Sequence, residues 1–460
     1  MTQGASSSPG NPEALLVREL GVRQLAAGIF NYTVGSGIFA LPAFAVALLG
    51  PSAAIAYVVC GIVIGLVVLC FAEAGSRVDR TGGPYAYVEV ALGPLIGLIS
   101  GALLWLAELT ATAAVATIFA GSVIALTGPT PGIPLRELLV IGVFAILAAV
   151  NIRGVKQGAR LLEAATVVKL LPLLLFVIVG AAYVVPKNLA WTDLPPTGTI
   201  LNACGILIFA FAGIEGALIP SGEVRDPART VPRAAIIALA SITVLYLAIQ
   251  LVAQGILGAR LAEDKVTPLA TAAGLAVGNA GRTIMLLAAT ISMFGYLSGA
   301  VLATPRCLFA FARDGFLPRA FATVHPRFRT PSFAIIVNTI LTLALALSGT
   351  FVGLAILANV TVLLLYMFCA VAAWVLRRKD VRLAGAPFQI PGGSLVPILA
   401  FGALGWILLS TVTVREFLAV GVVVAVAVGM YTARMFRTEA HQEADMAKTA
   451  KVREDPEGRP

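Results

Sequence analysis

Apolar side chains occur along this chain in long continuous runs, and polar residues gather in the intervals between the runs. A helix that crosses the hydrocarbon core of a bilayer needs about 20 apolar residues. Twelve runs of about this length recur along the chain, so the pattern predicts an all-α polytopic membrane protein with twelve transmembrane helices. The expected spans are 23–49, 52–75, 93–124, 135–151, 162–184, 199–222, 232–255, 281–312, 331–350, 351–376, 392–413 and 415–436.

The basic residues set the expected orientation, because cytoplasmic loops are the ones enriched in Lys and Arg. Most of the 32 basic residues fall on the side of the N-terminus. The polar segment 1–22 is therefore expected to be a cytoplasmic tail rather than a signal peptide, and 438–460 a second cytoplasmic tail. The basic residues expected on the opposite side are Arg136, Lys187, Arg260, Lys265, Arg282 and Arg415.

Composition narrows the class of protein further. With 59% hydrophobic and 12% charged residues, lipid is the expected solvent for most of the chain, and the net charge of +9 reflects topology rather than nucleic-acid binding. The five cysteines lie in apolar runs without paired spacing, and His325 and His441 lie outside the spans. No catalytic residue, metal site or cofactor is therefore expected, so the pattern argues against an enzyme. It also lacks the polar rings of an ion channel.

Two spans contain glycine pairs, where a helix is most easily interrupted. Residues 35–42 in the first span read Gly-Ser-Gly-Ile-Phe-Ala-Leu-Pro, and residues 209–216 in the sixth read Phe-Ala-Phe-Ala-Gly-Ile-Glu-Gly. Non-helical backbone at membrane depth is tolerated only where it lines a cavity enclosed by protein. Because the two interruptions lie five spans apart, they predict two five-helix repeats of inverted topology with a site at their interface.

An unwound helix offers both halves of a site for a zwitterion. Backbone N–H groups at the start of the following half-helix attract an anion such as a carboxylate, while freed carbonyls accept an ammonium group. An amino acid carries both groups on one carbon, so two facing breaks suit it. The alternative is that these glycines only allow close helix packing, as small residues do throughout membrane proteins.

Three further segments follow in order along the chain. They read Thr-Gly-Gly-Pro-Tyr-Ala-Tyr at 81–87, Gly-Glu-Val-Arg-Asp-Pro-Ala-Arg at 222–229, and Ala-Arg-Asp-Gly-Phe-Leu-Pro at 312–318. With the two glycine segments, these motifs resemble those of the amino acid-polyamine-organocation (APC) superfamily of amino acid permeases. The resemblance covers the chain from about 20 to 437.

The resemblance implies an alternating-access carrier with a 5+5 inverted-repeat (LeuT-like) core in which helices 1 and 6 are broken. The core would be 23–376, with repeat one at about 23–184 and repeat two at about 199–376. Two peripheral transmembrane helices would follow at 377–437.

The same resemblance implies where a substrate binds. Its carboxylate would meet the backbone of the first break, and its amine would face carbonyls of the sixth helix, where Phe209 would be a gating aromatic. As an ordinary membrane-helix phenylalanine, Phe209 also has a purely structural interpretation. The implied binding residues are Gly35, Ser36, Gly37, Ile38, Phe209, Ala212 and Gly213.

Three ionisable residues lie at membrane depth, where each is costly unless it faces a cavity or a partner. Lys169 matches a family position where an amine replaces a bound sodium ion; it would couple transport to protons, act as a fixed cation, or snorkel to the interface. Glu215 would change protonation as the site opens, or make a permanent hydrogen bond. Glu108 resembles an acidic position of cationic amino acid carriers, and would bind a cationic substrate or pair with Lys169.

Together these features predict a secondary active transporter for amino acids in the cell (inner or plasma) membrane, sodium-independent and proton-coupled. An exchanger of amino acids or polyamines is the alternative within this class, and an amino acid sensor on a transporter scaffold is the alternative from another class. The expected partners are a small amino acid or amine substrate, protons and the lipid bilayer, with the protein a monomer or homodimer.

Overall fold

Helices make up every regular element of the part of the chain that the computed structural model describes, namely residues 20–80, 82–128, 132–153, 159–191, 193–219, 221–328, 330–383 and 385–454. The one β-type pairing in these ranges is an isolated parallel bridge between Leu20 and Val224. Nearly all of the expected N-terminal tail, 1–22, lies outside the described residues, and so do residues 455–460.

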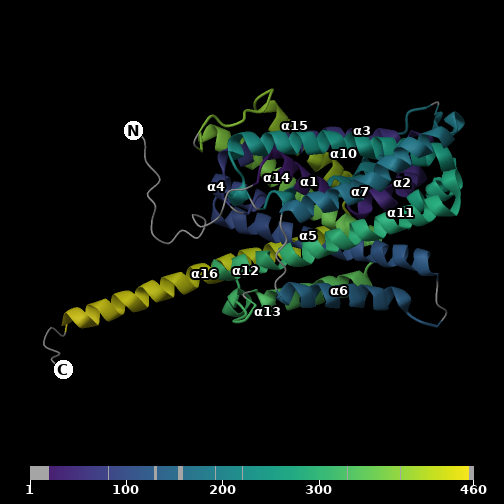
Figure 1. The fold of residues 1–460 in the computed structure, drawn as a ribbon. Coiled ribbons are helices and arrows are strands. Elements are labelled where there is room, and N and C mark those ends of the chain that lie inside the picture. The colour runs from purple at the N-terminus through teal and green to yellow at the C-terminus, as the bar shows by residue number, and fades with distance from the viewer. Residues whose placement is uncertain are drawn as a thin grey trace.

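The helices run side by side in one bundle (Figure 1). Short 3-10 turns connect several of them. Their bounds are α1 Val22–Thr33, α2 Ser36–Leu49, α3 Ala54–Arg77, α4 Pro84–Leu92, α5 Pro94–Thr127, α6 Leu135–Arg153, α7 Ala159–Gly180, α8 Thr197–Phe211, α9 Ile214–Ala217, α10 Pro227–Leu257, α11 Pro268–Ala303, α12 Pro305–Arg313, α13 Ser332–Ser348, α14 Phe351–Arg378, α15 Leu395–Thr411 and α16 Val414–Glu454.

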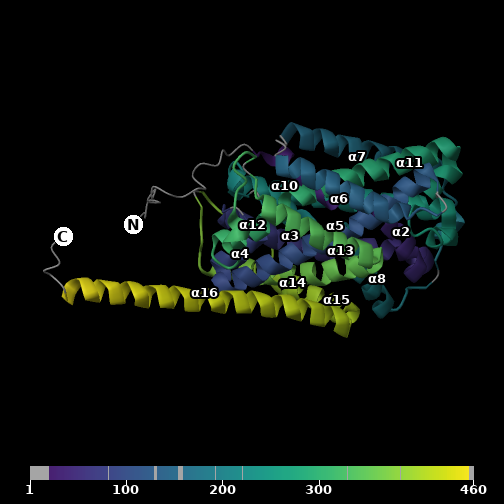
Figure 2. The ribbon, with the colours of Figure 1, turned by 90° about the horizontal axis from the view of Figure 1, so that it is seen from below.

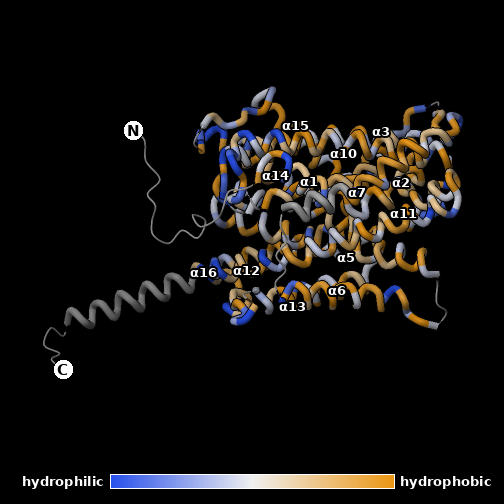
Figure 3. Tube along the Cα trace, in the orientation of Figure 1, coloured by the Kyte–Doolittle hydropathy of each residue, from blue (hydrophilic) through white to orange (hydrophobic). Residues whose placement is uncertain are grey.

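The distribution of polarity along these helices is that of a membrane protein. Apolar residues occupy the middle of the bundle, and polar residues gather at its two ends (Figure 3). Among the described residues, eight helices are long and apolar enough to cross a bilayer, or nine if α1 and α2, which meet at a bend of 50°, form one span. The prediction of an all-α polytopic membrane protein is confirmed at this level. Three shorter apolar helices are Val168–Tyr183, Ser332–Ser348 and Leu395–Thr411.

The last helix is longer than its apolar run predicts. The expected span ends at 436, but α16 continues without interruption to Glu454, so the described part of the expected C-terminal tail extends this helix. Figure 2 shows α16 along one side of the bundle and projecting beyond it. Only 11% of its most apolar stretch is buried against the protein. The helix therefore lies at the periphery of the bundle.

A buried ion cluster fixes α3 to the end of α14. The Glu73 carboxylate is fully buried, and it accepts hydrogen bonds from Arg77 Nη2 at 2.9 Å and Arg377 Nε at 2.7 Å. The backbone N–H of Ile390 also donates to Glu73, at 3.3 Å. A buried carboxylate is tolerated when such partners satisfy it. The cluster therefore holds the segment after α14 over the end of α3.

Candidate functional site

The first helical interruption separates α1 from α2. Val34 (φ −79°, ψ 79°) and Gly35 (φ −109°, ψ −143°) leave the helical conformation, and α2 begins at Ser36. The first N–H groups of α2 therefore have no partner within their own helix. They supply the donors and the positive dipole end on which anion binding at a helix N-terminus depends.

Side chains from three other helices satisfy carbonyls released at the end of α1. Lys169 Nζ on α7 donates to the Asn31 oxygen at 3.1 Å, and the Tyr246 hydroxyl on α10 donates to the Thr33 oxygen at 3.1 Å. Ser292 Oγ on α11 donates to the Val34 oxygen at 3.4 Å. The surrounding bundle thus stabilises the break, as non-helical backbone at membrane depth requires.

The second interruption separates α8 from the short helix α9. Ala212 is extended (φ −69°, ψ 155°), and Gly213 has a φ of +122°, which L side chains rarely adopt. Glu215 lies directly behind this turn, and its Oε2 accepts hydrogen bonds from the Gly213 N–H at 2.9 Å and from the Tyr366 hydroxyl at 2.6 Å. The carboxyl group therefore joins the break to α14.

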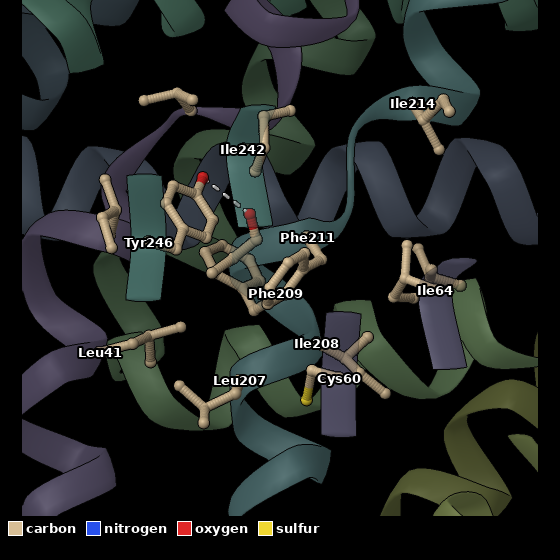
Figure 4. Packing of buried hydrophobic residues seen from close by; sticks show 14 of the residues in the cluster. Leu41, Cys60, Ile64, Leu207, Ile208, Phe209, Phe211, Ile214, Ile242 and Tyr246 are labelled. Atoms are coloured by element: carbon tan, nitrogen blue, oxygen red, sulfur yellow. Dashed lines mark hydrogen bonds between the residues drawn. The ribbon is translucent and has the colours of Figure 1, made fainter. Parts of the chain in front are cut away.

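The two interruptions lie against each other. A Cβ on Gly37 would stand 2.7 Å from Cα of Ala210, and one on Gly213 would stand 2.7 Å from the Tyr32 carbonyl oxygen. Tyr246 bridges the same contact, since its hydroxyl also reaches the Ala210 oxygen at 3.0 Å. Figure 4 shows Tyr246 directed toward the end of α8, beside Phe209 and Phe211. The glycines therefore do allow close packing, and this packing brings the two breaks together.

A cavity lies where the breaks meet, between α5, α11 and α14. Its free volume is about 30 Å³, room for about two water molecules, so a larger solute requires lining groups to move. Eight of the ten residues that the sequence singles out line the cavity. These are Gly35, Ser36, Gly37, Glu108, Phe209, Ala212, Gly213 and Glu215.

The other two predicted residues, Ile38 and Lys169, lie outside this lining. Ile38 is completely buried in the core of the bundle. Lys169 is only 3% exposed and reaches the backbone of α1 rather than the membrane interface. A Cβ on Gly295 of α11 would stand 3.5 Å from the Lys169 Cε. Lys169 thus lies behind the first break.

The cavity contains two buried carboxyl groups on different helices. Glu108, on α5, is 7% exposed, and its Oε1 would stand 3.0 Å from a Cβ on Gly216. Glu215 is 2% exposed. Within the described part of the chain, no salt bridge joins Lys169 to Glu108. Glu108 therefore faces the cavity and is not paired with Lys169.

A row of aromatic contacts begins at Phe209, which lines the cavity. Phe209 packs edge-to-face on Phe351 with ring centroids 5.6 Å apart, and Phe351 packs on Phe44 at 6.0 Å. The Lys265 ammonium lies 5.6 Å from the centre of the Phe44 ring. This row of contacts runs from the cavity to the loop before α11. Displacing Phe209 would therefore disturb the whole row.

Several residues of the site were missed in the sequence. Tyr246, Ser292 and Tyr366 support the breaks through hydrogen bonds. Thr33 and Asn359 line the cavity, and within the described residues the Thr33 Oγ1 and Asn359 Oδ1 atoms are buried without a hydrogen-bond partner. The signal that could have found these residues is their polarity within otherwise apolar spans.

Comparison with known proteins identifies the family to which these helices and this cavity belong. A sequence model of the amino acid permease family matches residues 20–439. The chain is 32% identical to the methylthioribose transporter of Bacillus subtilis (strain 168), over 86% of this chain and 88% of that protein. It is 29% identical to the serine/threonine exchanger of the same organism, over 86% and 91%. The branched-chain amino acid permease of that organism is 28% identical, over 84% and 87%.

The family match covers most of the chain, including both interruptions and the cavity between them. The relatives are named as permeases, transporters and exchangers, and their similarity extends over most of their own length. The protein is thus a transporter rather than an enzyme. The chain belongs to the amino acid permease family of the APC superfamily.

Proposed function

We propose that this protein is a secondary active transporter that carries amino acids across the cell membrane by alternating access. The observation that carries the proposal is that both broken helices meet at one cavity. The family match and the amino acid permeases among the relatives support the substrate class. The small volume of the cavity supports a conformational change during transport, because an amino acid needs more room than two water molecules.

The proposed architecture has twelve transmembrane helices. The nine long spans, counting α1 and α2 as one, and the three shorter apolar helices support this number. The breaks fall in the first and sixth of these spans, which supports a core of two five-helix inverted repeats at 23–184 and 199–376. Two peripheral helices would follow at 377–437. The excess of basic residues on one side supports cytoplasmic termini.

The substrate would bind between the two breaks. Its carboxylate would accept hydrogen bonds from the N–H groups of Ser36, Gly37 and the neighbouring residues at the start of α2. Its ammonium would face the carbonyls at the end of α8, near Phe209 and Ala212. Phe209 would move as the cavity opens, since it contributes both to the lining and to the aromatic row. Gly35, whose Cβ would meet nothing closer than Tyr296 at 3.8 Å, would leave room for the substrate backbone, whereas Gly213 would allow the turn between α8 and α9.

Lys169 would couple transport to protons without sodium. Its ammonium is buried and bonds a carbonyl released by the first break, which is where a bound cation would stabilise that backbone. Loss of its proton would weaken this bond and let α1 move relative to α7. Glu215 would respond to the same movement through its bonds to Gly213 and Tyr366.

Exchange of amino acids or polyamines is the alternative mechanism, and the serine/threonine exchanger among the relatives favours it. In that case Lys169 would be a fixed cation. The methylthioribose transporter among the relatives makes a solute rich in hydroxyl groups a second candidate substrate, which the polar atoms of the cavity would also fit. A sensor role on this scaffold remains the alternative from another class.

Uptake into liposomes that contain the purified protein tests this proposal. A panel of labelled amino acids would be offered without sodium, with or without an inward proton gradient. We expect the gradient to raise uptake of one substrate class in empty liposomes. Uptake that requires amino acid inside the liposomes and ignores the gradient would establish exchange. No uptake of any amino acid, into empty liposomes or into liposomes loaded with amino acid, would contradict amino acid transport.

A further inference from the structure

Among the described residues, three of the seven buried side-chain oxygens that lack a hydrogen-bond partner belong to residues that line the proposed binding cavity. Three residues that line it, Thr33, Ser36 and Asn359, each have a buried oxygen that receives or donates no hydrogen bond within the described part of the chain. More than 90% of buried polar groups in native proteins are paired. Three exceptions around one cavity therefore indicate that these atoms meet a polar solute.

The orientation of the Asn359 amide is fixed by its neighbours. Its Nδ2 donates to the Gly205 oxygen at 2.7 Å and reaches the Ile206 oxygen at 3.3 Å, so the two hydrogens of the amide face α8. A flipped amide would place two oxygens 2.7 Å apart, which resolves the usual ambiguity between the two ends. Asn359 therefore offers Oδ1 as an acceptor and has no hydrogen left to donate.

Asn359 lies on a different helix from the backbone groups that are proposed to hold the carboxylate and ammonium of the substrate. The carboxylate and ammonium would be held by α2 and α8, whereas Asn359 lies on α14. The other cavity residues of α14 are the apolar Ala358 and Val362. On α5, Glu108 is a second acceptor among small apolar residues. The side of the cavity formed by α14 and α5 therefore offers two acceptors, Asn359 and Glu108, to the side chain of the substrate.

We propose that Asn359 is a specificity-determining residue that accepts a hydrogen bond from the substrate's side chain. The carrier then selects side chains with a donor group, such as a hydroxyl, an amide or an ammonium, over apolar side chains of the same shape. A site that pairs a donor rejects the analogue lacking it, because the acceptor is then left buried and unpaired. This inference rests on the proposed amino acid transport.

Threonine and valine provide matched probes, since they differ by a hydroxyl in place of a methyl group. Each would compete with a labelled amino acid that the protein transports, and the concentration for half-inhibition would be measured. Asparagine and leucine form a second pair. In the wild-type protein we expect threonine to inhibit at a concentration at least about 10-fold lower than valine.

The variant Asn359→Leu removes the acceptor with little change in volume, and we expect it to reduce the threonine preference to about 2-fold or less. Thr361→Val is the control on the same helix. The Thr361 hydroxyl bonds Leu357 and Ala358 of its own helix and does not line the cavity, so this control should keep the wild-type ratio. If Asn359→Leu does not fold, Asn359→Ala, which also removes the acceptor, would take its place, and the same loss of the threonine preference is expected.

The outcomes distinguish this inference from the proposed function. A wild-type protein that transports amino acids without preferring threonine and asparagine would overturn the role of Asn359 alone. So would an Asn359→Leu variant that folds and keeps the full preference. Failure of every amino acid to be transported or to compete would instead reject the proposed function, and the specificity claim with it.

Discussion

Gly37 and Ala210 are in contact through their backbones, at the point where the two broken helices meet. A Cβ on Gly37 would stand 2.7 Å from Cα and 3.2 Å from the backbone nitrogen of Ala210, both closer than ordinary van der Waals contact. The absence of a side chain at one residue therefore determines how closely α2 and α8 approach. The shape of the cavity depends on this contact, since residues of both breaks line it.

Gly37→Ala should force α2 and α8 apart. Overpacking of this kind costs about 1–3 kcal/mol, and we expect uptake to fall by about 10-fold or more, as measured in liposomes. Gly65→Ala on α3 is a matched control, because its Cβ would meet nothing closer than Leu239 at 3.9 Å. If the two variants transported equally well, the contact between the breaks would not matter for transport.

Lys169→Gln should uncouple transport from the proton gradient. The neutral amide can still donate to the Asn31 carbonyl but cannot carry the charge of the ammonium. We expect stimulation of uptake by the gradient to be lost, while exchange of internal for external substrate persists. Lys187→Gln, which changes an exposed residue outside the helices of the bundle, should leave the stimulation intact.

If uptake by the Lys169→Gln protein were still stimulated by the gradient, a residue other than Lys169 would couple transport to protons. Loss of both uptake and exchange in a folded variant would instead identify Lys169 as a fixed structural cation. These two results would contradict the proposed coupling role in different ways.

Glu108→Gln should change the preference among substrates. A buried carboxylate in the cavity attracts a cationic side chain, and replacing it with a neutral amide removes that charge. We expect competition by arginine or ornithine to weaken at least about 10-fold relative to competition by a neutral amino acid. Glu137→Gln, which changes a half-exposed side chain on α6 outside the cavity, is the control. Equal weakening for both kinds of substrate would show that Glu108 does not recognise substrate charge.

Tyr246→Phe should destabilise the junction of the two breaks. It removes the hydroxyl that serves the Thr33 and Ala210 carbonyls, at a cost of about 1–3 kcal/mol, which thermal unfolding in detergent would measure. Tyr57→Phe makes the same chemical change at a buried hydroxyl that has no hydrogen-bond partner within the described residues. It should therefore be nearly neutral. Similar stabilities for the two variants would mean that the Tyr246 bridge contributes little.

The sequence predicted the helical membrane architecture and the location of both breaks, because long apolar runs and glycine pairs are local signals. It did not predict which residues support the breaks. A membrane helix is apolar on the lipid side and the protein side alike, so hydrophobic periodicity does not tell which way Tyr246 or Asn359 points. For the same reason the sequence does not tell that the Ile38 side chain is buried in the core, whereas the predicted role of this residue concerns its backbone and stays a prediction.

Contacts between segments far apart in the sequence could not be predicted from local patterns either. The pairing of Glu73 with Arg377 joins residues 304 positions apart, and neither charge alone indicates its partner. Lys169 was singled out by its burial in an apolar run, but its position behind the break, outside the cavity, depends on how α7 packs against α1.

A structure of the protein with a transported amino acid bound tests most directly that the two breaks form the substrate site. The amino acid would be the one that gives the highest uptake in the liposome panel. We expect its carboxylate within hydrogen-bond distance of the N–H groups at the start of α2, and its ammonium facing the carbonyls at the end of α8. A substrate bound away from both breaks, in a transport-competent protein, would contradict the account.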